Sequence, residues 1–398
     1  MTSSFTTAEL RQTNLSRALQ AVQRAGSMTR AELTRELGIS RNTSAQIVGD
    51  LVDLGLLVET AAGPSGRRGR PTTELRLGPE LPAAVVAEIT PEDVRIATVR
   101  LGRAIEDSDS APLGEQDPGQ VLAWVARQAG GRIAMLGGAC QGVAVSVYGL
   151  VDSEGVVQNA PNLSWHGVAV GDSLRRALPE GTPVYVGNDA SMAALHEARY
   201  GAGVDVGVML YLYSADGVGG GLVVDGRLLE GRQGYAGEVG HMMVNPIGAF
   251  CRCGRRGCWE TEVDQRALRH RGHAPPALGD VEAAESILAA SQAGSADARA
   301  AVEETARWFG EGLGSLLNVI DPDIVVLAGL FSRLWELAHD EVAAVAARRS
   351  LAAPADLNGR IVVSSDQRDA SLLGAADHMM APLLARPGSL WTAGRWPA

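Results

Sequence analysis

GEVGHMMVNPIGAFCRCGRRGCWE, residues 237–260, holds three of the four cysteines in a chain of 398 residues. An imidazole and three thiols are the donor set of a closed, tetrahedral structural zinc site, and the glycines between the thiols allow the tight turns that such a site needs. The segment therefore predicts a structural Zn2+ bound by His241, Cys251, Cys253 and Cys258. A thiol redox switch, or surface cysteines without a shared role, are the alternatives.

A bound metal would make this loop rigid and fix the orientation of His241, so that its second ring nitrogen could point at a ligand. Glu238 precedes this histidine by three residues, and Glu260 follows the last cysteine by two. Both carboxylates would then lie beside the imidazole. The cysteines are thus predicted to hold the wall of a pocket rather than to carry out its chemistry.

The charge distribution separates a small basic segment from an acidic body. The net charge is −11, yet residues 1–78 hold ten arginines against seven acidic residues. A basic module of this kind is typical of nucleic-acid binding, whereas the acidic remainder argues against a protein that coats DNA or an anionic membrane. No apolar signal segment opens the chain and no run approaches eighteen apolar residues. The sequence therefore predicts a soluble, cytoplasmic protein with no membrane partner.

The first eighty residues have the pattern of a winged helix-turn-helix. Apolar residues recur at helical spacing in three consecutive segments, residues 14–26, 29–38 and 40–59. Thr29 and Glu32 form a capping box for the second segment, and Ser40 is the expected N-cap of the third. Two short strands, GLLVET and ELRL, follow around a loop and would complete the wing. Residues 1–62 are therefore predicted to be a DNA-binding domain, with a three-helix interaction domain as the alternative.

In this geometry the N-terminal end of the third helix enters the major groove of an operator. The polar residues predicted to reach bases and phosphates there are Ser40, Arg41, Asn42, Thr43, Ser44 and Gln46. Residues 63–81 form a basic wing and linker that contains Gly-Arg-Arg-Gly-Arg-Pro. Arginines on such an extended backbone suit a narrow minor groove, which predicts DNA contacts for Arg67, Arg68 and Arg70. A flexible, solvated linker is the alternative.

Residues 82–398 alternate between strand and helix patterns and predict two α/β lobes with a cleft near residues 188–189. Asn188 and Asp189 end a buried strand just before a helix, which is a usual site position in open α/β sheets. Asp189 could act as a general base toward a substrate hydroxyl, or could simply cap the helix. The turn-rich loop NAPNLSW, residues 159–165, could supply Asn162 to a ligand.

Four segments together resemble the ROK family of repressors, open reading frames and sugar kinases: residues 160–165 (APNLSW), 188–195 (NDASMAAL), 217–231 (GVGGGLVVDGRLLEG) and 234–260. The resemblance covers essentially the whole chain, because the family's repressors also begin with a winged helix-turn-helix and a Gly-Arg-Pro linker. It implies an actin/hexokinase-like two-lobed α/β domain after the DNA-binding domain, assembled as a homodimer or homotetramer. In the family's kinases the matching positions hold the sugar hydroxyls, which here are Asn162, Asn188, Asp189, Glu238, His241 and Glu260. The residue matching Asp189 is the catalytic base of those kinases.

Three departures separate this chain from the family's kinases. The turn that cradles ATP phosphates reads AEITPEDVR at residues 87–95, without the kinases' two glycines and with acidic residues that would repel a triphosphate. Asp216 stands where the second phosphate loop has a small hydroxyl residue, and VLAGLFS replaces the Gly-Gly pair near the nucleotide base. We therefore expect no catalysis.

The predicted function is a DNA-binding regulator of carbohydrate metabolism genes, most simply a repressor, that responds to a monosaccharide or sugar derivative. The alternatives are an active ATP-dependent sugar kinase fused to a DNA-binding module, or a ligand-independent regulator controlled by a protein partner.

Overall fold

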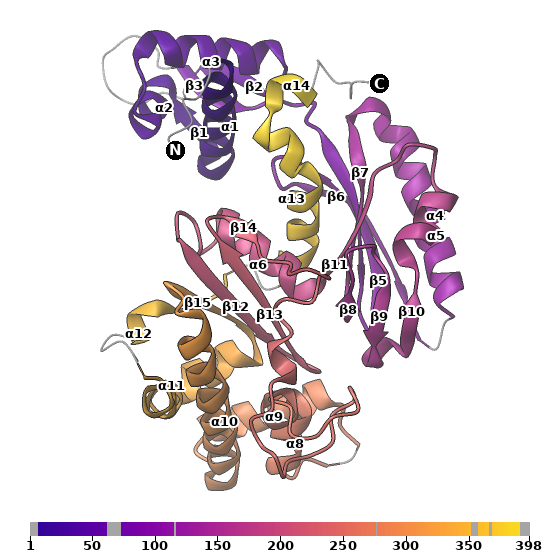
Figure 1. Cartoon of the computed structure of the whole chain (residues 1–398), viewed down its shortest axis with the longest axis vertical. Helices are drawn as coiled ribbons and strands as arrows, with labels where there is room; N and C mark the ends of the chain where they lie inside the picture. The colour runs from indigo at the N-terminus through magenta and orange to yellow at the C-terminus, as the bar shows by residue number, and fades with distance from the viewer. Residues whose placement is uncertain are drawn as a thin grey trace. The chain divides into compact units, whose positions relative to one another are not determined.

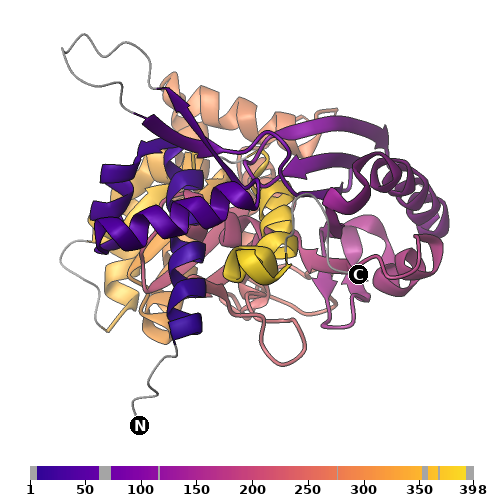
Figure 2. The ribbon, with the colours of Figure 1, turned by 90° about the horizontal axis from the view of Figure 1, so that it is seen from above.

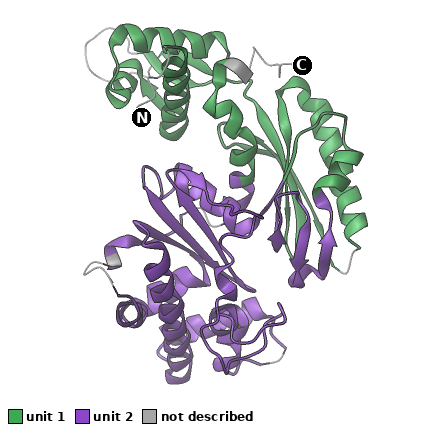
Figure 3. Ribbon diagram, in the orientation of Figure 1, with its two compact units in different colours: residues 1–145, 171–185, 375–398 green, residues 146–170, 186–374 purple. Residues whose placement is uncertain are grey.

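The structure, a computed structural model, describes residues 7–61, 73–114, 117–275, 277–351, 357–365 and 368–390 (Figure 1). It divides into two compact units, coloured separately in Figure 3. Unit 1 contains residues 1–145, 171–185 and 375–398, and unit 2 contains residues 146–170 and 186–374. The sequence-derived domain boundaries at residues 62 and 81 remain predictions. Within the described ranges, no helix is long and apolar enough to cross a membrane.

The N-terminal part of unit 1 is a winged helix-turn-helix, as predicted. Its elements are α1 (Thr7–Ala25), β1 (Ser27–Thr29), α2 (Arg30–Leu37), α3 (Arg41–Asp53), β2 (Leu57–Ala61) and β3 (Thr73–Leu77). The strands form an antiparallel sheet in the order β1-β3-β2. Leu19, Leu33, Leu51 and Leu75 are fully buried where the helices meet this sheet. The helix α14 (Pro387–Leu390) also packs against α1 and α3, as two views show (Figure 1 and Figure 2).

The caps at the helix-turn-helix confirm the sequence prediction. The Thr29 hydroxyl accepts a hydrogen bond from the Glu32 backbone at 3.2 Å, and the Glu32 carboxylate accepts one from the Thr29 N–H at 2.7 Å. Gly38 ends α2 in the left-handed conformation, with φ of 66°. The Ser40 hydroxyl then accepts from the Thr43 N–H at 3.1 Å and starts α3. The turn is therefore specified locally, by residues within a few positions of it.

Thr29→Ala removes one side of this capping box, and we expect it to weaken the first turn of α2 by about 1 kcal/mol. Hydrogen exchange of the α2 amides should then become about fivefold faster, because local opening sets the exchange rate. The matched control is Thr13→Ala, since that hydroxyl lies inside α1 and bonds only to the Glu9 carbonyl. Equal acceleration in both variants would contradict a capping role for Thr29.

The remaining sheets lie in the body of the chain. A five-stranded sheet has the order β11-β7-β4-β5-β6, a second has the order β14-β13-β12-β15-β16, and a three-stranded sheet has the order β10-β9-β8. Their strands are β4 (Ala83–Ile89), β5 (Asp93–Arg100), β6 (Ile105–Pro112), β7 (Cys140–Val147), β8 (Leu150–Val151), β9 (Val157–Ala160), β10 (Trp165–Val168), β11 (Val184–Asn188), β12 (Val208–Ser214), β13 (Val218–Val224), β14 (Arg227–Leu228), β15 (Ile324–Gly329) and β16 (Ile361–Val363).

Helices cover these sheets. They are α4 (Pro118–Leu136), α5 (Val170–Ala177), α6 (Asp189–Tyr200), α7 (Glu260–Val263), α8 (Gln265–Arg271), α9 (Asp280–Gln292), α10 (Ala296–Ile320), α11 (Leu330–Arg349), α12 (Leu357–Arg360) and α13 (Ala370–Ala385), with short 3-10 turns η1 (Gly137–Ala139), η2 (Pro161–Leu163) and η3 (Val239–His241). In unit 2, Leu210 and Leu212 of β12 join a core with α10 and α11, whereas Met209 and Tyr211 join one with α6. Because successive residues of β12 join cores on opposite faces, this sheet is covered on both sides.

The sequence predicted most of these elements, including the hairpin of β4 and β5, β7, β11 followed by α6, and α10. It missed β6, whose sequence IEDSDSAP has no apolar alternation and whose side chains are mostly exposed. This strand lies at the edge of its sheet and pairs only with β5. An edge strand that buries few side chains lacks the periodic signal on which strand prediction depends.

An aromatic cluster in unit 2 anchors the segment that carries the cysteines. Trp259 is fully buried, with its ring centroid 5.2 Å from that of Phe331, which lies 4.3 Å from that of Phe309. The Trp259 indole N–H donates to the Trp308 carbonyl at 2.9 Å. Gly312 of α10 faces this indole so closely that a Cβ there would collide with it. The residues on either side of Trp259, Cys258 and Glu260, are therefore held at fixed positions.

Candidate functional site

The four residues singled out as metal ligands lie together. The donor atoms of His241, Cys251, Cys253 and Cys258 all lie within 4.8 Å of one another. Two isolated antiparallel bridges, Met243 with Cys258 and Phe250 with Arg256, fold the loop back on itself. Gly254 and Gly257 have φ of 85° and 73°, a left-handed conformation that glycine adopts without strain. The glycines therefore make the turns for which the sequence analysis proposed them.

This donor set fits a metal ion. The Sγ atoms of Cys253 and Cys258 are 3.7 Å apart, and Cys251 Sγ lies 3.7 Å from Nδ1 of His241. A tetrahedron with metal–sulfur bonds of about 2.3 Å has edges of about 3.8 Å, close to these separations. Burial raises the pKa of the Cys258 thiol to about 11 and that of Cys251 further. These two thiols therefore need a nearby cation before they carry charge, and the cluster could hold a metal ion.

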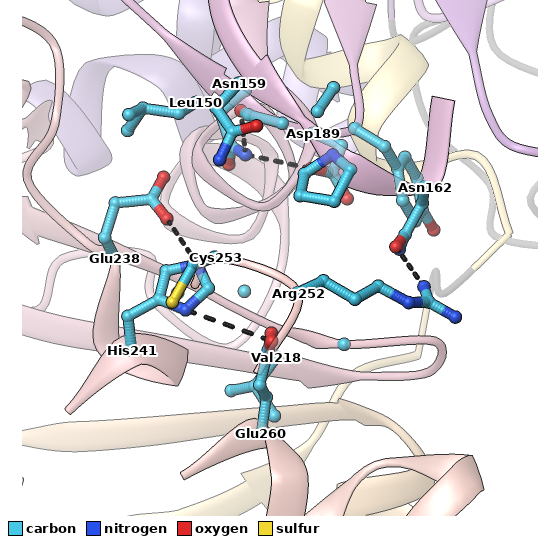
Figure 4. Close-up of a pocket in the computed structure, with 18 of the residues that line it drawn as sticks. Leu150, Asn159, Asn162, Asp189, Val218, Glu238, His241, Arg252, Cys253 and Glu260 are labelled. Carbon is cyan, nitrogen blue, oxygen red and sulfur yellow. Dashed lines mark hydrogen bonds and ion pairs between the residues drawn. The ribbon is translucent and has the colours of Figure 1, made fainter. Parts of the chain in front are cut away.

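Beside the cluster lies a pocket of about 550 Å³ whose lining residues all belong to unit 2. The sequence predicted a cleft near residues 188–189, and Asn188 and Asp189 both line this pocket. Its walls are formed by β8, β9 and η2, the start of α6, the turn between β12 and β13, and the cysteine loop. Figure 4 shows them with selected side chains. All six residues predicted to meet a sugar line this pocket: Asn162, Asn188, Asp189, Glu238, His241 and Glu260.

The start of α6 places Asp189 in the pocket. Asn188 is the N-cap, because its Oδ1 accepts from the Ser191 N–H at 3.1 Å. Its Nδ2 donates to the Gly149 carbonyl at 3.0 Å and lies 3.1 Å from Asp189 Oδ1. The capping role considered for Asp189 thus belongs to Asn188. Asp189 itself is only 9% exposed and presents a carboxylate at the pocket wall.

Carboxylates flank the imidazole as the sequence suggested. Glu238 Oε2 lies 3.8 Å from Nε2 of His241, and Glu260 Oε1 lies 3.9 Å from its Nδ1. Glu260 also accepts a hydrogen bond from the Cys251 thiol at 2.8 Å. Burial raises the pKa of Glu238, although the nearby imidazole opposes this effect. The pocket therefore offers several hydrogen-bond acceptors in a partly desolvated setting, which suits a ligand rich in hydroxyl groups.

Asn162 lines the pocket but is already bonded. Its Nδ2 donates to the Asp216 carbonyl at 2.8 Å, and its Oδ1 accepts from Nη1 of Arg252. The same guanidinium lies 2.9 Å from the Asp216 carboxylate, which Arg266 approaches at 3.3 Å. These contacts tie three loops of the pocket together. Asn162 is thus positioned by the protein itself, which its place in a turn-rich loop did not reveal.

Several further lining residues were not singled out from the sequence. Tyr148 and Tyr213 share a hydrogen bond of 3.1 Å between their hydroxyl groups, and both line the pocket. Arg252 and Asn159 are two others. Asn159 lies in the same NAPNLSW segment as Asn162, and Arg252 lies between two cysteines. Their positions in these motifs were the available signals, but only the structure shows which way each side chain points.

The recognition helix presents most of the predicted DNA-contact residues. Ser40, Arg41, Asn42 and Gln46 are exposed, and Thr43 is half-exposed. Ser44 is only 1% exposed, so its assignment to the DNA surface is wrong. It lies three and four positions before Ile47 and Val48, and this spacing places it on the face that packs into the module. Arg67, Arg68 and Arg70 lie outside the described residues.

Comparisons with known proteins agree with this organisation. Residues 94–381 match the model of the ROK family, and residues 16–68 match that of the MarR family. The chain is 26% identical over 394 residues to a xylose repressor of Caldicellulosiruptor bescii, covering 95% of this chain and 98% of the repressor. It is 30% identical over 257 residues to a glucokinase of Streptomyces coelicolor, covering 60% of this chain and 80% of the enzyme.

Among solved structures, too, a regulator is similar to nearly the whole chain and a kinase to only part of it. A ROK family transcriptional regulator, described as a homolog of the E. coli MLC protein, aligns with a TM-score of 0.73 and 26% identity over 95% of this chain and 97% of the regulator. A ROK glucokinase from Streptomyces griseus, solved with glucose and AMPPNP, aligns with a TM-score of 0.62 and 27% identity over 74% of this chain and 98% of the enzyme. The N-terminal module thus has a counterpart in the regulators.

Proposed function

The chain belongs to the ROK family, and on that premise we propose that it is a sugar-responsive transcriptional repressor of carbohydrate metabolism genes. The observation that carries this proposal is the presence, in one chain, of a winged helix-turn-helix and a pocket lined by carboxylates and an imidazole. The similarity to a xylose repressor along 95% of the chain supports it. The active sugar kinase and the regulator controlled by a protein partner are the competing functions.

The sugar would bind through its hydroxyl groups. The carboxylates of Asp189, Glu238 and Glu260 accept hydrogen bonds, and His241 stands between the two glutamates. Binding would change operator affinity by a coupling free energy of about 1–3 kcal/mol, the usual range for allosteric proteins. A homodimer or homotetramer would place two recognition helices on two operator half-sites.

The metal in this proposal is a structural zinc ion bound by His241, Cys251, Cys253 and Cys258. The fit of the donor atoms supports this assignment. Bound zinc would convert the thiols to thiolates and make the loop rigid. His241 would then be held by its Nδ1 side, with Nε2 directed toward Glu238 and the pocket.

We also propose that the chain does not transfer phosphate. In the turn that would cradle ATP phosphates, the Thr90 hydroxyl accepts from the backbone N–H groups of Glu92 and Asp93 at 3.3 and 3.1 Å. A phosphate cradle needs such N–H groups to be free. In the second loop the Asp216 carboxylate is bound by Arg252 and Arg266. An ADP-release assay with a hexose panel tests this directly, and sugar-dependent ADP release would establish the kinase alternative.

The glycine run of that second loop has a structural explanation. A Cβ at Gly219 would come within 2.6 Å of the Ala190 Cβ, and one at Gly221 would collide with Ala194. Both alanines lie on α6, which packs directly on β13. The glycines are therefore needed for the close approach of α6 to the sheet, with or without a nucleotide.

The decisive test of the repressor function is fluorescence anisotropy of the full chain on its own upstream DNA. The titrants are monosaccharides, amino sugars and their phosphates, with D-xylose and D-glucose included because of the named relatives. A shift in operator affinity with one sugar supports the proposal. Tight DNA binding that ignores every sugar would instead favour the regulator controlled by a protein partner.

Arg41→Ala tests the recognition helix separately. Because Arg41 is exposed at the first position of α3, we expect this variant to weaken operator binding by about tenfold, the usual size of one lost DNA contact. The matched control is Arg17→Ala, an exposed arginine on α1. The same anisotropy assay measures both. An unchanged affinity for the Arg41 variant would exclude this end of the helix from the DNA interface.

A further inference from the structure

Two distant segments of the chain hold the side chain of Asn162, one at each end of its amide. The nitrogen Nδ2 donates to the backbone carbonyl of Asp216, in the turn between β12 and β13, at 2.8 Å. The oxygen Oδ1 accepts from Nη1 of Arg252 in the cysteine loop, and Figure 4 shows the Arg252 side chain directed toward Asn162. These partners are 54 and 90 positions away in sequence. The local turn at residues 161–163 therefore does not by itself fix the amide.

The two partners also bind each other. Nη1 of Arg252 lies 2.9 Å from Oδ2 of Asp216, and Nε of Arg266 lies 3.3 Å from the other oxygen of that carboxylate. Arg266 in turn pairs with the buried carboxylate of Asp264 at 2.6 Å. Asp264 caps α8 by accepting from the Ala267 N–H at 2.8 Å. Because each group orients the next, a continuous set of charged contacts leads from a buried helix cap to the pocket.

This arrangement orders the amide of Asn162 without exhausting its hydrogen bonds. An asparagine nitrogen can donate two hydrogen bonds, and its oxygen can accept two. The described residues use one of each in Asn162, which leaves one donor and one acceptor position for a ligand. The side chain is only half-buried and lines the pocket. A side chain that is already ordered loses less conformational entropy on binding than one that rotates freely.

We propose that Asp216 and Arg252 are positioning residues, which hold the amide of Asn162 in the orientation that the sugar requires. Both act through Asn162 and make no contact with the sugar themselves. The inference rests on the proposed function, because it says how the same site is prepared for its ligand. It also gives Asp216 a role of its own. A small hydroxyl residue at this position could not form the ion pair that directs the guanidinium toward Asn162.

The experiment is a double-mutant cycle between Arg252 and Asn162, measured by calorimetric titration of the full chain with D-xylose and D-glucose. We expect Arg252→Gln to weaken sugar binding by about fivefold, because Asn162 must then be ordered at the expense of binding. Asn162→Ala should weaken it by about tenfold, since the hydrogen bonds themselves are lost. The double variant should bind no more weakly than Asn162→Ala alone, because nothing remains for Arg252 to position.

Two further variants test the ion pair. Asp216→Ala removes the carboxylate but keeps the backbone carbonyl that Asn162 bonds, so it should weaken binding about as much as Arg252→Gln and add little to it. Arg252→Lys retains one charged donor, and it should recover most of the lost affinity. Recovery by this conservative change distinguishes positioning from a general loss of structure. Circular dichroism and metal analysis of each variant check that the fold and the metal content are unchanged.

The matched control is Arg269→Gln. Arg269 pairs with Asp280 at 2.7 Å, and both side chains are 28% exposed, against 37% for Arg252 and 27% for Asp216. This second ion pair also lies in unit 2, but neither of its residues lines the pocket. Its loss should therefore leave sugar affinity as it is. An equal loss of affinity in Arg269→Gln and Arg252→Gln would contradict a specific role for Arg252.

The outcomes separate this inference from the proposed function. If Arg252→Gln weakens binding by the same factor with and without Asn162, Arg252 does not act through Asn162 and the positioning role is wrong, even where sugar still shifts operator affinity. If the effects are coupled as expected but no sugar shifts operator affinity, the inference holds and the repressor function fails. Anisotropy on the operator, measured with the same sugars and variants, provides this second readout.

Discussion

Asp189→Asn should weaken sugar binding by about 10- to 100-fold and leave operator binding in the absence of sugar unchanged. The substitution keeps the shape of the side chain and replaces a charged acceptor by a neutral amide. Hydrogen bonds to charged groups contribute about 1.5–3 kcal/mol, roughly twice the value of neutral ones. Asp189 is only 9% exposed, so water cannot easily replace the lost interaction. Calorimetry measures the sugar affinity, and anisotropy measures the operator affinity.

The control for this variant is Asp172→Asn. Asp172 lies on α5 with a largely exposed side chain, and its carboxylate pairs with Arg175 at 2.8 Å. It is not among the residues that line the pocket, so its replacement should change neither affinity. Loss of operator binding in the Asp189 variant would show that this carboxylate supports the fold rather than a separate sensor site. Unchanged sugar binding would show that Asp189 makes no contact with the sugar.

Cys253→Ser should lower the zinc content from one ion per chain to none and abolish the sugar response. Four ligands are needed to close a structural zinc site, and such sites contribute about 10–16 kcal/mol in small zinc domains. Loss of one ligand therefore removes most of the binding free energy. The loop would then lose the ion that fixes His241, although Trp259 still anchors its C-terminal end. Metal analysis of the purified chain measures the first effect, and anisotropy with sugar measures the second.

Cys140→Ser is the matched control for this loss. Cys140 lies in β7, outside the four-residue cluster, and its thiol donates weakly to the Gly142 carbonyl at 3.7 Å. Its replacement should leave zinc content and sugar response as they are. A full complement of zinc in Cys253→Ser would contradict the assignment of Cys253 as a ligand. Loss of zinc with an intact sugar response would show that the metal is not needed to hold His241 in position for the sugar.

The sequence predicted those parts of the fold whose signals are local. The capping box of Thr29 and Glu32 and the left-handed Gly38 act within one turn of chain, and they appear in the structure as expected. The cysteine cluster was likewise predictable, because its donors are close in sequence and two glycines permit the turns. By contrast, β6 exists through its pairing with β5, and its own residues carry no strand pattern.

Side-chain states in the pocket were not predictable for a related reason. Asn159 and Asn162 belong to one motif and differ by three positions, yet only Asn162 is bonded by the protein. The difference depends on Arg252 and Asp216, which are distant in sequence and reach Asn162 through the folding of other loops. The burial of Ser44 depends similarly on which face of α3 packs inward. The motifs therefore located the site, but the hydrogen-bond partners of each side chain could be identified only from the fold.

The packing of α6 on β13 has a consequence for how such chains are counted in genomes. Ala190 and Ala194 leave no room for a Cβ at Gly219 and Gly221, so this chain needs both glycines for the packing of α6 whether or not it binds a nucleotide. A glycine run that packing alone requires is therefore not by itself a sign of phosphoryl transfer. Surveys that identify sugar kinases by the glycine run would thus overestimate their number. The turn at residues 90–93 would be the more informative character, because its backbone N–H groups are the ones that a phosphate would need and that the Thr90 hydroxyl bonds here.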